Sequence, residues 1–323
     1  MKCKKKFLLP IIAMLLSVAI LITLSSCGKT LDDIEYQIIS SGNTSKDGFI
    51  YSVYENDTIV ITGKTQAFTE MIIPDEIDGK KVVEIGANAF EGDETLVKLT
   101  LGNNVMRIRE DAFNSCSRLV MVDATENLLD IRASAFYNCQ RLTEFKGATQ
   151  LMRIGNSAFY CCESLVYFDF PETIELIDAE AFSGCIKLTE VKFPEDLESI
   201  GEMAFAFCTS LTKVTLNDKI VDIPNGLFLQ CEYIESLFIP SSVKTISEHA
   251  FRGNKALKNL YLSDGVESIG LASFANCPSL KNIYYDGSAS DYEDISIDPS
   301  NDSFDNVTVL YDQDFEELLV KED

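Results

Sequence analysis

Apolar residues recur along this chain with a fixed period of 23 residues. A constant period in the range of 20 to 50 residues is typical of a solenoid, in which one small unit is stacked many times. The clearest column is phenylalanine, which recurs without insertion or deletion at Phe90, Phe113, Phe136, Phe159, Phe182, Phe205, Phe228, Phe251 and Phe274. The pattern therefore predicts an elongated repeat protein with an extended surface.

Further columns keep the same period. An isoleucine stands five residues before each phenylalanine, from Ile85 to Ile269, and apolar residues follow six, nine and usually eleven residues after it. The last two positions are two residues apart, so their side chains point to one face of a short strand. The spacing in the isoleucine-to-phenylalanine segment favours a short helical turn. We expect each repeat to run strand, turn, short helix and turn, with stacking that forms a parallel sheet over a continuous core.

The repeating unit reads I-x-x-x-A-F-x-x-C-x-x-L-x-x-L-x-L, and its L-x-x-L-x-L frame resembles a leucine-rich repeat. The A-F-x-x-C-x-x-L portion is clear at Ala181–Leu188 and Ala204–Leu211, and it resembles the BspA-type repeat of bacterial surface proteins over about residues 70–285. The resemblance implies an α/β repeat solenoid, a right-handed leucine-rich-repeat superhelix with a parallel sheet. It also implies a surface lipoprotein that binds other macromolecules.

Segments on both sides of the repeats have the pattern of caps, which a solenoid needs to cover its terminal units. Residues 49–82 begin with alternating apolar positions on both sides of a turn at Asn56-Asp57, which predicts a β-hairpin in an N-terminal β cap. Nine repeats would then occupy residues 83–285, and residues 286–323 would form a C-terminal cap and an acidic, frayed tail. The strand-like pieces of that last unit are Ile295–Ile297 and Val307–Tyr311.

The N-terminus has the features of a bacterial lipoprotein signal. A lysine-rich start precedes an uncharged stretch, Phe7–Leu24, which leads into L-S-S-C ending at Cys27. We expect a signal peptide over residues 1–26, a lipid on the Cys27 sulfur and a short tether over residues 27–48. An uncleaved anchor helix is the alternative, since the uncharged stretch could nearly span a bilayer. In both cases the protein would be extracytoplasmic and attached to the surface of the bacterial cell envelope.

Charge and composition narrow the classes of partner. The formal net charge is −24, and removing residues 1–26 takes away only lysines among the charged residues. So acidic a body repels phosphate backbones, which argues against nucleic acid as a partner. The single histidine, His249, leaves no catalytic set, and the acidic stretches lack the spacing of a calcium loop. The sequence therefore predicts a monomer that is not an enzyme and that needs no cofactor or metal.

Most of the cysteines share one column, three residues after the phenylalanine. Asp93 and Asn254 take the same position in two repeats, which indicates a ladder of polar side chains that bond backbone groups in a turn. Parallel side chains in a ladder aim their sulfur atoms poorly at one another, which favours buried thiols over disulfides or a metal site. Cys161 lies outside the column and is expected to be the most accessible thiol. The column comprises Cys116, Cys139, Cys162, Cys185, Cys208, Cys231 and Cys277.

The outward face of the strands carries the candidate ligand-binding residues. Ten residues after the last three phenylalanines stand three aromatic residues, Phe238, Tyr261 and Tyr284, and Tyr167 belongs to the same face. A row of rings on an outward strand face indicates contact with a partner. Two alternatives are that the C-terminal cap folds over these rings and that they only stabilise the sheet by stacking. In the middle repeats the same column alternates in charge, which predicts a ladder of cross-strand ion pairs.

Together these features predict a lipid-anchored binding scaffold on the cell surface. It would mediate protein–protein interaction or adhesion through the strand face, with an extracellular or host protein as the partner and the membrane contacted through the lipid on Cys27. One alternative is a carbohydrate-binding surface protein, since rows of tyrosine and phenylalanine stack on sugar rings. Another is a structural envelope spacer without a specific ligand.

Overall fold

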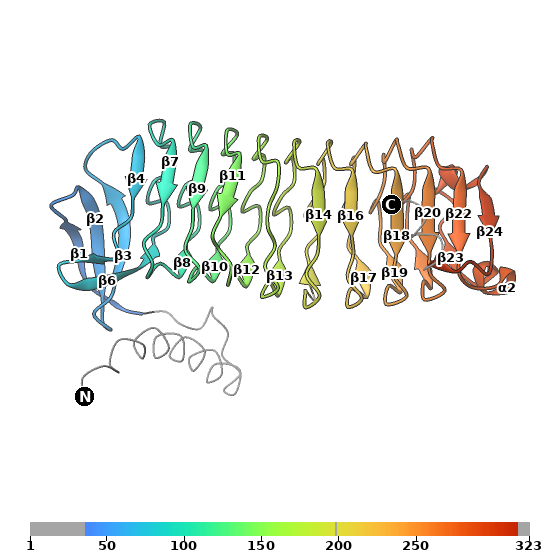
Figure 1. Cartoon of the computed structure of the whole chain (residues 1–323), viewed down its shortest axis with the longest axis horizontal. Helices are drawn as coiled ribbons and strands as arrows, with labels where there is room; N and C mark the ends of the chain where they lie inside the picture. The colour runs from blue at the N-terminus through green and yellow to red at the C-terminus, as the bar shows by residue number, and fades with distance from the viewer. Residues whose placement is uncertain (1–35, 198, 316–323) are drawn as a thin grey trace, which may run out of the picture.

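The computed structural model describes residues 36–197 and 199–315 of the chain. Figure 1 shows coils stacked side by side along one long axis, from the blue N-terminal end to the red C-terminal end. The predicted signal peptide, the Cys27 lipid site and the alternative anchor helix lie outside the described residues. Within the described part of the chain, no helix has the length and apolar character needed to cross a membrane.

Each coil typically contributes one strand to a front row and one to a back row. The front row contains the strands that follow the phenylalanines, which pair in parallel in three stretches, β4–β7–β9–β11, β14–β16 and β18–β20–β22–β24. Neighbouring strands are in register at a step of one repeat, as in Leu99 with Val122. Their bounds are β4 (Glu70–Ile72), β7 (Lys98–Thr100), β9 (Met121–Asp123), β11 (Glu144–Lys146), β14 (Glu190–Lys192), β16 (Lys213–Thr215), β18 (Ser236–Ile239), β20 (Asn259–Leu262), β22 (Asn282–Tyr285) and β24 (Thr308–Leu310).

The back row contains two-residue strands that end at the repeated isoleucines. Ile131 pairs with Ile108 on one side and with Ile154 on the other, so the isoleucines also form a parallel ladder. The strands are β8 (Arg107–Ile108), β10 (Asp130–Ile131), β12 (Arg153–Ile154), β13 (Leu176–Ile177), β15 (Ser199–Ile200), β17 (Asp222–Ile223), β19 (Thr245–Ile246), β21 (Ser268–Ile269) and β23 (Ser296–Ile297). The predicted parallel solenoid is confirmed, with two rows of strands where one sheet was expected.

The predicted short helix in each repeat is wrong. Around Phe182, Glu180 and Gly184 have φ values of 57° and 76°, and left-handed residues recur at these two positions in every repeat. Such residues interrupt a right-handed helix. In addition, the Phe182 N–H donates to the Ala204 carbonyl of the next coil at 2.8 Å, instead of to a carbonyl four residues earlier. Among the described residues, helical structure is limited to α2 (Ala289–Glu293), the 3₁₀ turn η2 (Asp302–Phe304) and Phe315, all in the C-terminal unit.

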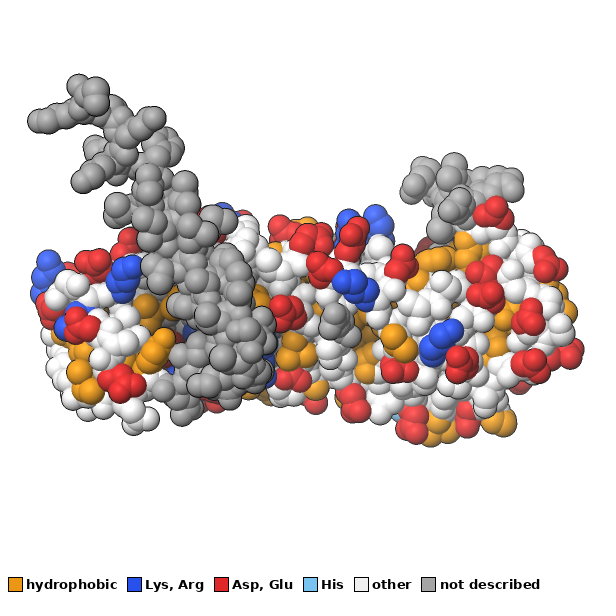
Figure 2. Space-filling model, turned by 90° about the horizontal axis from the view of Figure 1, so that it is seen from below, with side chains coloured by type: hydrophobic (Ala, Val, Ile, Leu, Met, Phe, Trp, Pro, Cys, Tyr) orange, Lys and Arg blue, Asp and Glu red, His pale blue; other side chains and the backbone are white. Residues whose placement is uncertain are grey.

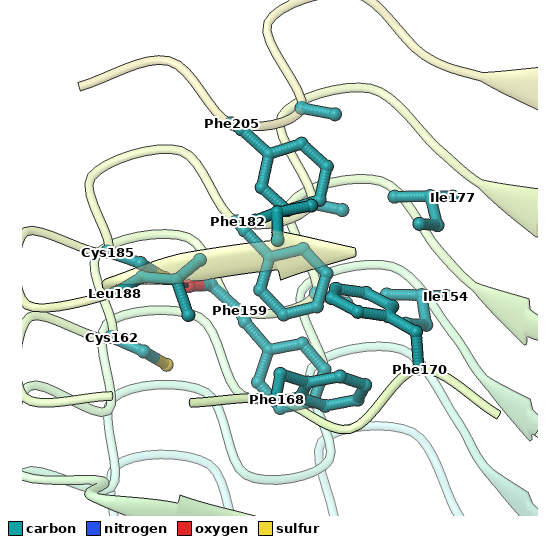
Figure 3. Close-up of a cluster of buried hydrophobic side chains, with 14 of the residues drawn as sticks. Ile154, Phe159, Cys162, Phe168, Phe170, Ile177, Phe182, Cys185, Leu188 and Phe205 are labelled. Atoms are coloured by element: carbon teal, nitrogen blue, oxygen red, sulfur yellow. Dashed lines mark hydrogen bonds between the residues drawn. The ribbon is translucent and has the colours of Figure 1, made fainter. Parts of the chain in front are cut away.

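The phenylalanine column forms the predicted central spine. All nine rings are at most 3% exposed. Successive rings stack with centroid distances between 5.1 Å and 5.8 Å. Figure 3 shows Phe159, Phe182 and Phe205 in this stack, with Phe168 and Phe170 packed against it. The spine repeats along the axis because one coil supplies one ring and the coils are in register.

The cysteine column also behaves as predicted. All eight cysteines in the described residues are free thiols, and the seven in the column are buried. The Cys185 thiol donates to the Phe159 carbonyl of the preceding coil, with a sulfur–oxygen distance of 3.3 Å, and the other column cysteines make the equivalent bond. Where asparagine replaces cysteine, the Asn254 amide donates to the Phe228 carbonyl at 2.9 Å. The side chains of this column therefore link each coil to the preceding one by a hydrogen bond.

The N-terminal cap contains the predicted hairpin. Strands β2 (Phe49–Tyr54) and β3 (Ile59–Lys64) pair in antiparallel fashion. On its other side, β3 pairs in parallel with β6 (Lys80–Ile85). The structure also has the short strand β5 (Glu76–Ile77), which pairs with β6. The tether expected over residues 27–48 is wrong for its last part, because β1 (Ile38–Thr44) pairs with β2 and extends this cap. Strand β1 was missed because its side chains are mostly exposed and show no apolar alternation.

The C-terminal cap continues both rows of strands. Strand β23 pairs with β21 in the back row, and β24 pairs with β22 in the front row, close to the predicted strand-like pieces. Helix α2 begins with a capping box in which Ser288 and Asp291 bond each other's backbone N–H groups. The phenylalanine spine ends here on Phe304, whose ring centroid lies 5.2 Å from that of Phe274. The last coil is thereby closed by residues outside the repeat pattern.

Candidate functional site

The front face of the middle coils is polar and open. Lys146, Asp169 and Lys192, which alternate in charge, are all exposed. Lys146 pairs with Glu144 of its own strand at 3.2 Å, and Lys213 pairs with Glu190 of the preceding coil at the same distance. The cross-strand pair found here therefore lies in the neighbouring column, eight residues after each phenylalanine, and among the described residues no ion pair joins Lys146, Asp169 and Lys192 of the predicted ladder. Exposed pairs of this kind are worth at most about 1 kcal/mol each, so this face is free to vary in sequence.

Tyr167 is an exposed aromatic residue on this open stretch, as predicted. Its side chain is 55% exposed and stands beside Val166, which is 45% exposed, while Phe168 points inward to the spine. Partial burial and the nearby Asp169 carboxylate raise the pKa of the Tyr167 hydroxyl, which lies 3.4 Å from that carboxylate. The pair thus presents a ring and a neutral hydroxyl to solvent. Tyr167 is three coils away from Phe238, about 14 Å at the usual strand spacing.

The three C-terminal rings do form a row. The parallel register places Phe238 of β18 beside Tyr261 of β20, and Tyr261 beside Tyr284 of β22. Tyr261 and Tyr284 stack with centroids 4.8 Å apart and planes 11° from parallel. We call Phe238, Tyr261 and Tyr284 the aromatic row. The row exists because side chains at one repeat position project from neighbouring strands to the same face.

Phe315 covers the middle of the aromatic row, contrary to the expectation of an open row, while Phe238 and Tyr284 stay half-buried. The Phe315 ring packs nearly perpendicular to the rings of Phe238 and Tyr261, with centroid distances of 5.5 Å and 5.8 Å and interplanar angles of 84° and 88°. As a result Tyr261 is only 3% exposed and Phe315 only 8%. Folding of the C-terminal cap over these rings, the alternative reading of the sequence, is therefore what the structure shows.

Sequence reasoning missed Phe315 itself. The segment from residue 312 to the C-terminus is rich in Asp and Glu, and its composition predicts a frayed tail. The structure instead ties its beginning to the last coils, because the Asp312 and Gln313 N–H groups donate to the Gly287 and Tyr285 carbonyls, each at 3.0 Å. The available signal was a single aromatic residue, Phe315, between acidic neighbours. A large apolar side chain in an otherwise polar segment indicates that the segment packs against the protein at that point.

Two asparagines beside the aromatic row were also missed. Asn259 and Asn282 occupy the position two residues before the tyrosines, and the Asn282 amide donates to the Asn259 side-chain oxygen at 3.0 Å.

A groove of about 570 Å³ lies at the turns of these last coils, lined mainly by polar residues that include Gln230, Asn276 and Asp302. Amide groups therefore accompany the rings at this end of the solenoid.

Metal chemistry finds no support in the described residues, where no group of three or more His, Cys, Asp or Glu side chains could hold an ion. The buried thiols are also poor nucleophiles, because burial raises the pKa of Cys208 and of Cys277 to about 12. The surface is dominated by negative charge, and Figure 2 shows acidic side chains spread over the side seen from below. What the molecule offers is a long surface with local aromatic contacts.

Comparisons with known proteins agree with the repeat pattern. Residues 64–189 and 176–301 match, in six copies, the sequence model described as BspA type leucine rich repeat region. A leucine-rich repeat protein from Bacteroides ovatus has the same fold, with a TM-score of 0.52, 22% identity and an alignment covering 83% of this chain and 76% of that chain. A comparison with curated proteins found no match.

Two further solved structures align with lower TM-scores. The leucine-rich repeat protein of T. pallidum is 26% identical, with a TM-score of 0.45 and coverage of 74% of this chain and 90% of that chain. A leucine-rich cell surface protein from Faecalibacterium prausnitzii is 19% identical, with a TM-score of 0.37 and coverage of 82% of this chain and 99% of that chain.

Proposed function

We propose that this chain, which belongs to the BspA-type leucine-rich repeat family, is a lipid-anchored surface scaffold that binds an extracellular or host protein through its front face. The observation that carries the proposal is the combination of a fixed spine with a variable outer face. The spine residues repeat in every coil and are buried, whereas the residues between them on the front strands differ from coil to coil. Solenoids use such extended surfaces for binding.

Tyr167 and the aromatic row are the proposed contact points. Large rings supply most of the energy of typical protein interfaces when a partner desolvates them. Tyr167 and Val166 are neighbours in the sequence and both are exposed. A small apolar patch of this kind costs little free energy in the absence of a partner, whereas a large one would be costly. The aromatic row adds a second group of rings toward the C-terminal end, where Phe315 covers Tyr261.

The binding test uses the chain with Cys27→Ser, which removes the lipid site but leaves the body unchanged. The protein is immobilised and probed with labelled extracellular proteins from bacteria and host cells, and bound proteins are quantified by mass spectrometry. We expect a saturable partner whose binding falls at least tenfold in Tyr167→Ala or in the triple alanine variant of the aromatic row. Tyr233→Ala is the matched control, because Tyr233 is 60% exposed but lies in a turn outside the front strands.

Folded variants that retain full binding would reject these contact points. If no saturable partner appears with either source of proteins, the binding function itself fails and a structural spacer in the envelope becomes the better account.

Carbohydrate binding is a second candidate, favoured by the asparagine pair beside stacked tyrosines. Tyrosine rings can stack on sugar faces, and the Asn259 and Asn282 amides can bond hydroxyl groups. A glycan array probed with the same protein separates the two candidates. Specific glycan signals that are lost in Asn282→Ala, with no protein partner found, would favour this second function.

Lipid anchoring is proposed from the L-S-S-C sequence ending at Cys27. Expression of the whole chain in a bacterium fed with labelled palmitate should give a labelled, membrane-associated protein. Cys27→Ala should remove the label and release the protein from the membrane fraction if export continues. Label that persists in Cys27→Ala would show that the lipid is elsewhere, and retention without any label would favour the uncleaved anchor helix.

A further inference from the structure

The turn that follows each spine phenylalanine carries one residue in the left-handed region of φ. This residue stands two positions after the phenylalanine, and in the last three repeats it is Gln230, Gly253 and Asn276, with φ values of 60°, 79° and 58°. The turns stack on one another, because the Gly253 N–H donates to the Ala275 carbonyl of the next coil at 2.9 Å. Since Gly253 has no side chain, it leaves a gap in this column between Gln230 and Asn276.

The C-terminal cap closes this gap into a groove. Asp302 and Ser303 of η2 and the nearby Asn306 line it together with the last repeats, and its volume is about 570 Å³. The Ser303 hydroxyl oxygen accepts from the Cys277 N–H at 2.9 Å, which fixes the cap against the turn of the last coil. A volume of about 300–1,000 Å³ is typical of small-molecule sites. We call this space the turn groove.

Three side-chain amides line the turn groove without a partner in the described part of the chain. They belong to Gln230, Asn276 and Asn306, and none of them makes a hydrogen bond to another described residue. The Gln230 amide lies over the gap, because a Cβ atom added at Gly253 would be 2.7 Å from its Nε2 atom. A primary amide has both donors and an acceptor. A sugar hydroxyl also donates and accepts, so these amides suit a ligand rich in hydroxyl groups.

Charge argues against an anionic ligand in the turn groove. Lys255 is the only basic residue among the described residues that line it, and its Nζ atom already lies 2.6 Å from a carboxylate oxygen of Glu232. Asp302 adds a carboxylate to the lining, and the whole chain has a formal net charge of −24. A phosphate or carboxylate group on a ligand would therefore be repelled.

The lining also differs from that of a protein-binding site. It contains no aromatic residue among the described residues, and Pro278 is the only exposed apolar side chain in it. Interfaces between proteins depend mainly on a few large rings and on arginine in desolvated pockets. A small neutral ligand with many polar groups therefore fits the turn groove better than a protein side chain does.

We propose that the turn groove binds a neutral sugar unit of an extracellular glycan. Gln230 and Asn276 bond its hydroxyl groups from the side of the repeats, and Asp302 and Asn306 bond them from the side of the cap. The gap at Gly253 gives the sugar ring its place between two coils.

This sugar site goes beyond protein binding by the front face and lies elsewhere on the molecule. Tyr167 belongs to the front face of a middle coil, and Asn259 and Asn282 begin the front strands β20 and β22. None of these three residues lines the turn groove. Substitutions at the two places can therefore be interpreted separately.

Saturation-transfer difference NMR tests the proposal on the chain with Cys27→Ser. The probes are the neutral trisaccharides maltotriose, cellotriose, mannotriose and triacetylchitotriose, with trigalacturonic acid as an anionic control. We expect saturation transfer to at least one neutral trisaccharide and none to trigalacturonic acid. Absence of transfer to every neutral probe, or equal or stronger transfer to the anionic one, would overturn the proposal.

Gly253→Asn fills the gap and leaves the backbone conformation unchanged. Asn138 and Asn276 occupy the same repeat position with φ values of 57° and 58°, so asparagine is compatible with this turn. We expect the Kd of the bound trisaccharide, measured by isothermal titration calorimetry, to rise at least tenfold. Gly92→Asn is the matched control, because Gly92 has the same repeat position, a φ of 68° and no atom within 4 Å of an added Cβ. An unchanged Kd in a folded Gly253→Asn protein would reject the turn groove as the site.

Amide replacements then locate the sugar. Asn276→Ala keeps the gap open but removes one amide, so the Kd should rise about fivefold, as expected for the loss of one hydrogen bond. A weaker affinity in Asn282→Ala together with no change in Asn276→Ala would place the sugar on the front strands and overturn the turn groove. Capture of a protein partner should fall in Tyr167→Ala and stay unchanged in Gly253→Asn, so the front-face proposal and this one fail separately.

Discussion

At the scale of single residues, position in the repeat decides what a side chain does. Phenylalanine at the repeated position is buried in every coil, whereas Phe207, two residues after a spine phenylalanine, is 42% exposed. The same residue type therefore has two roles, and the period separates them. The candidate rings at Phe238, Tyr261 and Tyr284 were found in the same way, but whether they were covered depended on Phe315, which has no place in the period.

Removal of one spine ring tests the packing of the core. Phe182→Ala should lower the free energy of unfolding in urea by about 3–5 kcal/mol, because it leaves a cavity between two stacked rings. Tyr233→Ala removes an aromatic side chain that is 60% exposed and serves as the control, with an expected change within about 0.5 kcal/mol. A loss below about 1 kcal/mol for Phe182→Ala would contradict the spine.

Thiol titration tests the cysteine ladder. Burial raises the pKa of the Cys208 and Cys277 thiols in the column, which keeps them protonated and unreactive, whereas Cys161 is only partly buried. In the protein with Cys3→Ser and Cys27→Ser at pH 8, a disulfide reagent should modify Cys161 first, and Cys161→Ser should remove that phase. Denaturant should then release the seven column thiols. Fast modification of several thiols in the native protein, or fewer thiols after denaturation, would indicate an open or oxidised ladder.

At the scale of elements, backbone hydrogen bonding between coils overrides local preference. The segment from isoleucine to phenylalanine has spacing that suits a helical turn, yet its N–H groups donate to the next coil and its isoleucine joins a back-row strand. Close stacking of coils also restricts side chains at the bends. Gly155 follows Ile154, and a Cβ atom there would lie 2.7 Å from the Ala133 nitrogen of the preceding coil.

Gly155→Ala should therefore destabilise the protein, by about 1–3 kcal/mol as for other overpacked sites. The matched control is Gly63→Ala in β3, where the nearest atom to a new Cβ would be 3.7 Å away and the backbone needs no positive φ. Urea unfolding of the two variants should show a loss only for Gly155→Ala. Equal stabilities would mean that the coils can separate at this bend at little cost.

At the scale of the whole molecule, stability is a sum over coils and their interfaces, because each coil contacts mainly its two neighbours. The caps close this array at both ends with strands that continue its rows, β3 and β6 at one end and β23 and β24 at the other. The length of the binding surface is then set by the number of coils. Its chemistry is set by the outward residues of each.

A deletion of one full coil tests this additivity. Removing residues 183–205, which is one period, leaves every column in register and should give a folded protein with a modestly lower melting temperature. Removing residues 183–204, one residue fewer, shifts the columns at the junction and turns inward side chains outward there. The shorter deletion should be the more damaging one in thermal unfolding. The reverse order would refute a register fixed by the period.

The sequence by itself determined the period, the spine, the thiol ladder, the hairpin cap and the location of the aromatic row. These follow from spacing alone, since residues one period apart occupy equivalent positions on neighbouring coils. Tertiary structure decided the back row of strands in place of helices, the entry of β1 into the cap and the cover by Phe315. The back row depends on backbone hydrogen bonds between coils, which the spacing of apolar side chains does not distinguish from a helical turn. The contacts of β1 and of Phe315 involve segments outside the period, so a repeating pattern carries no record of them.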